Sequence, residues 1–81
     1  MTGRNGLQFI EMSGKTLLRV VTENELSAGE LNEIGMSPHS IVRVNRQGDI
    51  ELRRVQGWDV IGGLLGDFEV RLKRETGLDW A

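Results

Sequence analysis

Short runs of alternating apolar and polar residues fill much of the chain and predict β-strands. The clearest two are residues 41–45 and 49–53, which flank a three-residue loop that ends in Gly48, where the turn needs a positive φ. That loop length fixes the register of a hairpin and sorts its side chains onto two faces. We expect Val42 opposite Leu52 and Val44 opposite Ile50 on one face, and Arg43 opposite Glu51 on the other.

Two β-rich runs nearer the N-terminus, 7–12 and 15–21, flank Ser13-Gly14 and predict a first hairpin with a two-residue loop. The register set by this loop gives the hairpin an inward apolar face and a mostly polar outward face. The inward face would carry Leu7, Phe9, Leu18 and Val20, and the outward face a single apolar pair, Ile10 and Leu17.

Two segments predict helices. Residues 22–35 contain the capping-box spacing twice, from Thr22 to Glu25 and from Ser27 to Glu30, which indicates one short helix, broken or continuous. A helix from about Trp58 or Asp59 to Thr76 follows from an apolar stripe, and Gly77 can form its left-handed cap. The stripe consists of Ile61, Leu64, Leu65, Phe68 and Leu72.

Together these elements predict an α+β domain of the order ββαββα. Its sheet would be four-stranded and antiparallel, built from two hairpins, with the long C-terminal helix covering one face. Residues 7–81 would form this single domain, preceded by a flexible lead-in over residues 1–6. The order of the strands stays open. On the uncovered face, Ile10, Leu17 and Ile41 would be spare apolar positions.

The amino-acid composition excludes several classes of function. The 81 residues are 38% hydrophobic and 27% charged, and they include no cysteine, which excludes a disulfide framework and a thiolate nucleophile. No apolar run reaches the roughly 18 residues of a membrane span, and no signal-peptide pattern follows Met1, so we expect a cytoplasmic protein. So short a chain buries only about 60 to 65% of its unfolded surface, which favours self-association, most simply as a dimer.

Signals of catalysis or cofactor binding are weak. Residues 13–16, Ser-Gly-Lys-Thr, are similar to the end of a phosphate-binding loop, but Phe9 occupies the position of the first required glycine. His39 is the only histidine, so a metal site would need carboxylates for its other ligands, and we interpret His39 as a turn residue. A nucleophilic Ser37 or Ser40 beside it is conceivable, but adjacency in sequence is not the geometry of a catalytic triad. We therefore expect no catalytic residues, cofactor or metal.

Two features suggest contacts with another chain. Gly62 and Gly66 would lie one helical turn apart, where the helix could approach the sheet or a symmetry-related copy closely. Trp80 either folds back on the sheet or docks on a partner as part of a short C-terminal tail. A small-ligand site in the glycine-rich segment 57–66 is a further hypothesis.

Four arginines on the second hairpin could form a basic strip for phosphates. Two observations oppose this interpretation. Asp49 and Glu51 interrupt the strip, and the outward face lacks aromatic residues for base stacking, because Phe9 and Phe68 are predicted to point inward. The arginines are Arg43, Arg46, Arg53 and Arg54.

The sequence therefore predicts a non-enzymatic protein–protein interaction or accessory module that self-associates. Its candidate contact residues are Ile10, Leu17, Ile41, Gly62, Gly66 and Trp80. A nucleic-acid-binding module that uses the Arg-rich hairpin is the alternative.

Overall fold

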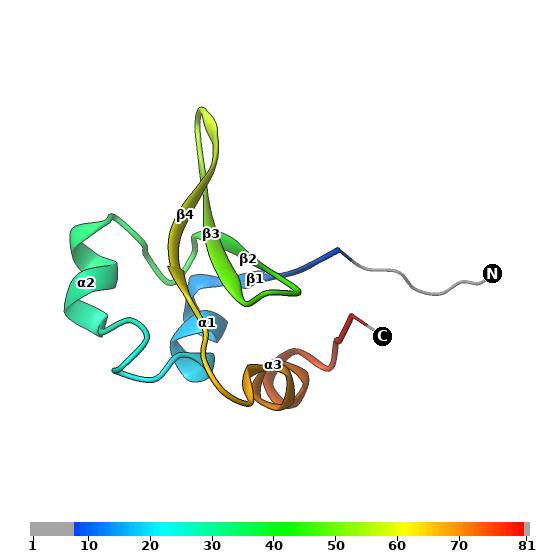
Figure 1. Ribbon diagram of the computed structural model, residues 1–81. Helices are drawn as coiled ribbons and strands as arrows, with labels where there is room; N and C mark the ends of the chain where they lie inside the picture. The colour runs from blue at the N-terminus through cyan, green and yellow to red at the C-terminus, as the bar shows by residue number, and fades with distance from the viewer. Residues whose placement is uncertain (1–7, 81) are drawn as a thin grey trace.

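The computed structural model describes residues 8–80 and contains, over that range, a four-stranded antiparallel sheet and three helices (Figure 1). The strands lie in the order β1-β2-β3-β4. The predicted lead-in, residues 1–6, lies outside the described residues. In chain order the elements are β1 (Phe9–Ser13), α1 (Gly14–Val20), α2 (Ala28–Glu33), β2 (Ile41–Asn45), β3 (Asp49–Arg54), β4 (Gly57–Gly63) and α3 (Phe68–Thr76).

The α+β class and the four-stranded antiparallel sheet are confirmed, but the element order is βααβββα and the first predicted hairpin is wrong. Residues 14–20 form helix α1, and β1 pairs instead with β2. The helix begins because the Ser13 side chain accepts a hydrogen bond from the Thr16 amide. Gly14 is buried so tightly that a Cβ there would lie 2.1 Å from the Ser37 carbonyl oxygen.

The hairpin of β2 and β3 is confirmed with its register. Gly48 has a φ of 90°, as the three-residue loop requires. Arg43 lies opposite Glu51, and the aliphatic pairs fall on the other face. This hairpin forms the middle of the sheet.

The prediction of a long C-terminal helix is wrong for the first half of that segment. The chain turns through residues 55–56 and returns as β4, so that only residues 68–76 are helical. Gly62 therefore lies in a strand, where the absence of a side chain admits Leu26, whose Cδ1 would be 3.0 Å from a Cβ. The left-handed conformation of Gly77 at the end of α3 is confirmed, with a φ of 75°.

The core lies on one face of the sheet. All three helices contribute buried residues to it, so within residues 8–80 no helix covers the opposite face, which we call the outer face. α1 contacts β1, β2 and α3. The buried residues are Ile10, Leu17, Val20, Leu26, Leu31, Met36, Val42, Val44, Ile50, Leu52, Leu64, Leu72 and Trp80.

A buried ion pair ties the connecting segments to α3. Glu25 and Arg71 form two hydrogen bonds of 2.7 and 2.9 Å, and the Glu25 side chain is only 2% exposed. Arg71 also donates to the carbonyl oxygens of Val20 and Leu65, and the Leu65 amide donates to Glu25 at 2.5 Å. The hydrogen bonds from Arg71 lower the pKa of Glu25 from 4.5 to about 2, although burial opposes this.

Candidate functional site: the outer face of the sheet

Several candidate contact residues lie in the core rather than on the surface. Ile10 and Leu17 are fully buried, so the expectation that they face outward is wrong. The reason is the pairing of β1 with β2, which places Ile10 opposite the core residue Val44. Ile41 lies on the outer face and is exposed, as predicted.

The C-terminal tail folds back onto its own chain. Trp80 is 3% exposed and meets the ring of Phe68 edge to face at 6.0 Å, and its carbonyl oxygen accepts a hydrogen bond of 2.7 Å from Arg46. Its indole Nε1 is buried without a hydrogen-bond partner among the described residues. Gly66 lies in the loop before α3 with a φ of 63° and no neighbouring atoms within 4 Å of a Cβ position.

The outer face carries an arginine held between two aromatic rings. The guanidinium carbon of Arg43 lies 3.7 Å from the ring centre of Phe9 and 4.0 Å from that of Trp58. Arg43 also forms a 2.8 Å ion pair with Glu51. Cation–π contacts of this kind contribute about 0.5 to 2 kcal/mol each, so they favour this stacked arrangement, which we call the platform.

Phe9 and Trp58 are the residues that the sequence patterns misplaced. Phe9 was expected to point inward, but in β1 it alternates with the buried Ile10 and therefore faces outward. Trp58 was predicted at the start of the C-terminal helix, but in β4 it pairs with Arg53 on the outer face. The expected lack of aromatic residues on this face is therefore wrong.

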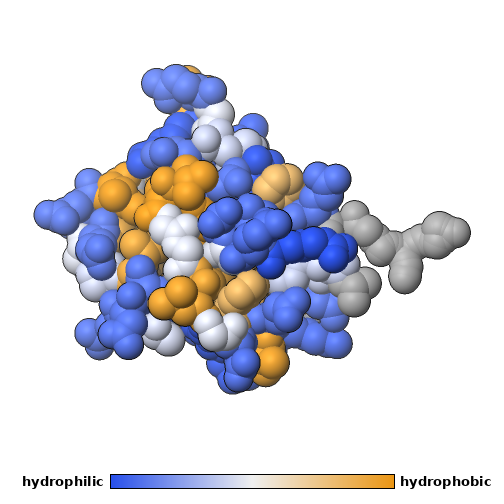
Figure 2. Space-filling view, viewed as in Figure 1, coloured by the Kyte–Doolittle hydropathy of each residue, from blue (hydrophilic) through white to orange (hydrophobic). Residues whose placement is uncertain are grey.

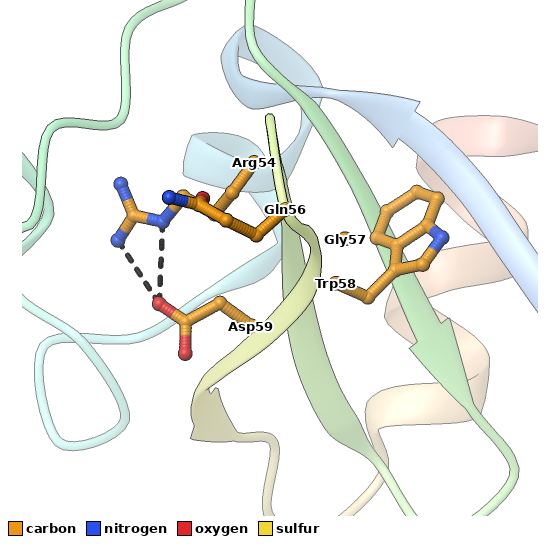
Figure 3. A pocket seen from close by; sticks show the side chains of 5 residues that line it. All are labelled: Arg54, Gln56, Gly57, Trp58 and Asp59. Carbon is orange, nitrogen blue, oxygen red and sulfur yellow. Dashed lines mark hydrogen bonds and ion pairs between the residues drawn. The ribbon is translucent and has the colours of Figure 1, made fainter.

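The other candidate arginines do not form a continuous strip. Arg54 pairs with Asp59 at 3.1 Å, and Figure 3 shows this pair on the opposite side of the β3–β4 ribbon from Trp58. Arg46 is bound to the tail carbonyl described above. Only Arg53, of the four, is exposed and makes no ion pair or hydrogen bond within residues 8–80.

Three shallow hollows border the outer face. One of about 370 Å³ lies beside Phe9 and includes Arg46, and one of about 380 Å³ lies at the hairpin tip beside Trp58 (Figure 3). The third, of about 290 Å³, is lined by Glu11, His39 and Ile41 among others. Hollows therefore lie beside both rings and beside Ile41.

The arrangement of the serines around His39 does not favour catalysis. The hydroxyl of Ser40 accepts a hydrogen bond from the Ser37 amide, and the hydroxyl of Ser37 accepts one from the His39 amide. Both hydroxyls thus stabilise the turn, and no hydrogen bond joins either to the imidazole. Within the described chain, no group of three or more His, Cys, Asp or Glu side chains could hold a metal ion.

The backbone amides of the segment similar to a phosphate-binding loop already donate hydrogen bonds within the fold. This segment joins a strand to a helix, so the prediction of a hairpin turn at Ser13-Gly14 is wrong. However, the amide of Gly14 donates to Ser40, that of Lys15 to Pro38 and that of Thr16 to Ser13. These amides are not free to bind a phosphate.

A second apolar area lies on another side of the molecule. Figure 2 shows apolar atoms gathered along β4 and toward α2 and α3. Leu65 is exposed at the end of this strand, while Leu26 is buried against Gly62.

Comparison with known protein families, with curated proteins and with solved structures found no match. Among the described residues, no helix is long and apolar enough to cross a membrane.

Proposed function

We propose that this chain is a non-enzymatic protein–protein interaction module that self-associates through the outer face of its sheet. The observation that carries the proposal is the partly exposed platform of Phe9, Arg43 and Trp58 on a sheet face that no described helix covers. Aromatic and arginine side chains are the residues that most often dominate binding energy at protein interfaces.

Exposed aliphatic side chains extend this platform. Val60 on β4 is 62% exposed and lies beside Glu51, and Ile41 on β2 is exposed next to the third hollow. Covering these residues with a partner removes apolar area from water, at about 25 cal/mol per Å². A small domain gains stability from such burial, which favours a dimer.

The experiment compares two valines of equal exposure. Val60→Lys places a charge on the outer face, whereas Val70→Lys places it on α3, where Val70 is 64% exposed. Light scattering from the micromolar to the millimolar range should show a dimer for the parent and for Val70→Lys, and a monomer for Val60→Lys. A parent that stays monomeric throughout, or equal loss in both variants, would contradict the proposal.

Binding of single-stranded nucleic acid is the second candidate function, and the aromatic rings favour it. Sheets that bind single strands stack bases on exposed aromatic side chains, and Phe9 and Trp58 occupy such positions. Charge opposes it, because the strands direct two arginines outward against three carboxylates: Arg43 and Arg53 against Glu11, Asp49 and Glu51. Fluorescence anisotropy with a labelled single strand tests it, since real binding should weaken steeply as salt is added.

A further inference from the structure

Two charged side chains on the outer face have no ion pair or hydrogen bond within residues 8–80. Arg43 is paired with Glu51, and Asp49 accepts a hydrogen bond from Asn45. Glu11 on β1 and Arg53 on β3 remain exposed, with opposite charges. A surface that holds, at separate places, a positive and a negative side chain with neither an ion pair nor a hydrogen bond is complementary to a second copy of itself.

We infer that a second copy of this chain docks on the outer face, with Glu11 of each copy paired with Arg53 of the other. The inference rests on the proposed self-association and specifies its geometry. A two-fold axis that runs parallel to the strands above β2 places β1 of one copy over β3 of the other, because β1 and β3 are the two neighbours of β2. Each Glu11 then faces the strand that carries the other copy's Arg53.

The separation along the strands suits this pairing. Glu11 and Glu51 both lie opposite Arg43, and Arg53 is two residues further along β3. Two residues of strand span about 7 Å, and sheets that pack face to face lie about 10 Å apart. Extended glutamate and arginine side chains that lean toward each other can bridge that distance.

The apolar side chains and the central stack fit the same arrangement. Phe9, Ile41 and Trp58 surround the axis position and would be covered, whereas Val60 on the outer strand β4 would lie at the edge of the contact. The two Arg43 side chains would approach each other near the axis, but each is neutralised by Glu51 and shielded by two rings. The pairing therefore adds contacts between opposite charges without leaving an unpaired arginine at the centre.

Charge reversal tests the pairing directly. Glu11→Arg alone and Arg53→Glu alone should each weaken self-association roughly tenfold or more, because each dimer then faces like charges at both contacts. An equimolar mixture of the two variants should associate again, since the arginine introduced at position 11 meets the glutamate introduced at position 53. Native mass spectrometry would identify the mixed dimer by its mass.

A matched pair controls for general attraction between proteins of different charge. Glu23→Arg and Arg19→Glu change the net charge equally at exposed positions outside the sheet, and each should dimerise alone as the parent does. A parent that dimerises while Glu11→Arg and Arg53→Glu have no effect would overturn the pairing and leave the proposed self-association standing. Failure of the mixture to associate would also overturn the pairing, and a monomeric parent would overturn both.

Discussion

Two Arg–Glu pairs of nearly equal length differ in what surrounds them. Glu25, whose side chain is 2% exposed, is joined to Arg71 at 2.7 Å, and Arg71 also binds two backbone carbonyls. Arg43 and Glu51 are joined at 2.8 Å on the outer face, where the guanidinium lies between two rings. The first pair connects α3 to the end of α1 and to the loops that contain Glu25 and Leu65, and the second lies on a surface. We therefore expect the first pair to matter for stability and the second for the proposed self-association.

Loss of the buried pair should have the largest effect. Glu25→Gln leaves the Arg71 charge without its partner, and hydrogen bonds between charged groups contribute roughly 2 kcal/mol. The free energy of unfolding from urea denaturation should fall by about that amount. Glu23→Gln, which changes an exposed carboxylate two residues away, should alter it by no more than about 0.5 kcal/mol. Equal losses of unfolding free energy in the two variants would contradict the structural role that we assign to the pair.

Acid should weaken the buried pair in a defined range. The pKa of Glu25 is about 2 in the folded chain and 4.5 in its ordinary state, so its stabilising contribution is complete above pH 4.5 and is lost as the pH falls toward 2. The difference in unfolding free energy between the parent and Glu25→Gln should therefore shrink over this range. Denaturation curves at a series of acidic pH values measure it, and a difference that stays constant would contradict the assignment.

Loss of the surface pair should have the smallest effect on stability. In Glu51→Gln the amide oxygen can still accept a hydrogen bond from Arg43, and the guanidinium keeps its contacts with both aromatic rings. Because both side chains are partly exposed, we expect a loss of no more than about 1 kcal/mol. The same urea measurement checks this, and a loss as large as that of Glu25→Gln would contradict the distinction between the two pairs.

The sequence patterns predicted the surface pair but not its surroundings. The β2–β3 hairpin is local, so its loop length and alternation were enough to place Arg43 opposite Glu51. The rings come from β1, a predicted strand whose pairing was wrong, and from β4, which was predicted as part of a helix. The pairing of β1 with β2 spans about thirty residues of chain, and no local pattern encodes it.

Two competing signals explain the misjudged strands. Residues 14–20 are rich in β-formers, yet the Ser13 cap and the burial of Leu17 and Val20 at helical spacing favour a helix. In the segment that forms β4 and the loop after it, the spacing of the apolar residues from Ile61 to Phe68 is similar to that of a helical stripe. The cost of glycines inside a helix, roughly 0.5 to 1 kcal/mol each, was the signal that favoured a strand around Gly62 and Gly63.

The two tryptophans allow the most direct test of the central claim, that the outer face is the surface of self-association. Trp58 lies on that face, and Trp80 is buried in the core. Their indole N–H groups give separate signals in a ¹H–¹⁵N spectrum recorded at low and high protein concentration. We predict that the Trp58 signal shifts with concentration while the Trp80 signal stays in place. A Trp58 signal that does not move, with or without a shift of Trp80, would contradict the account.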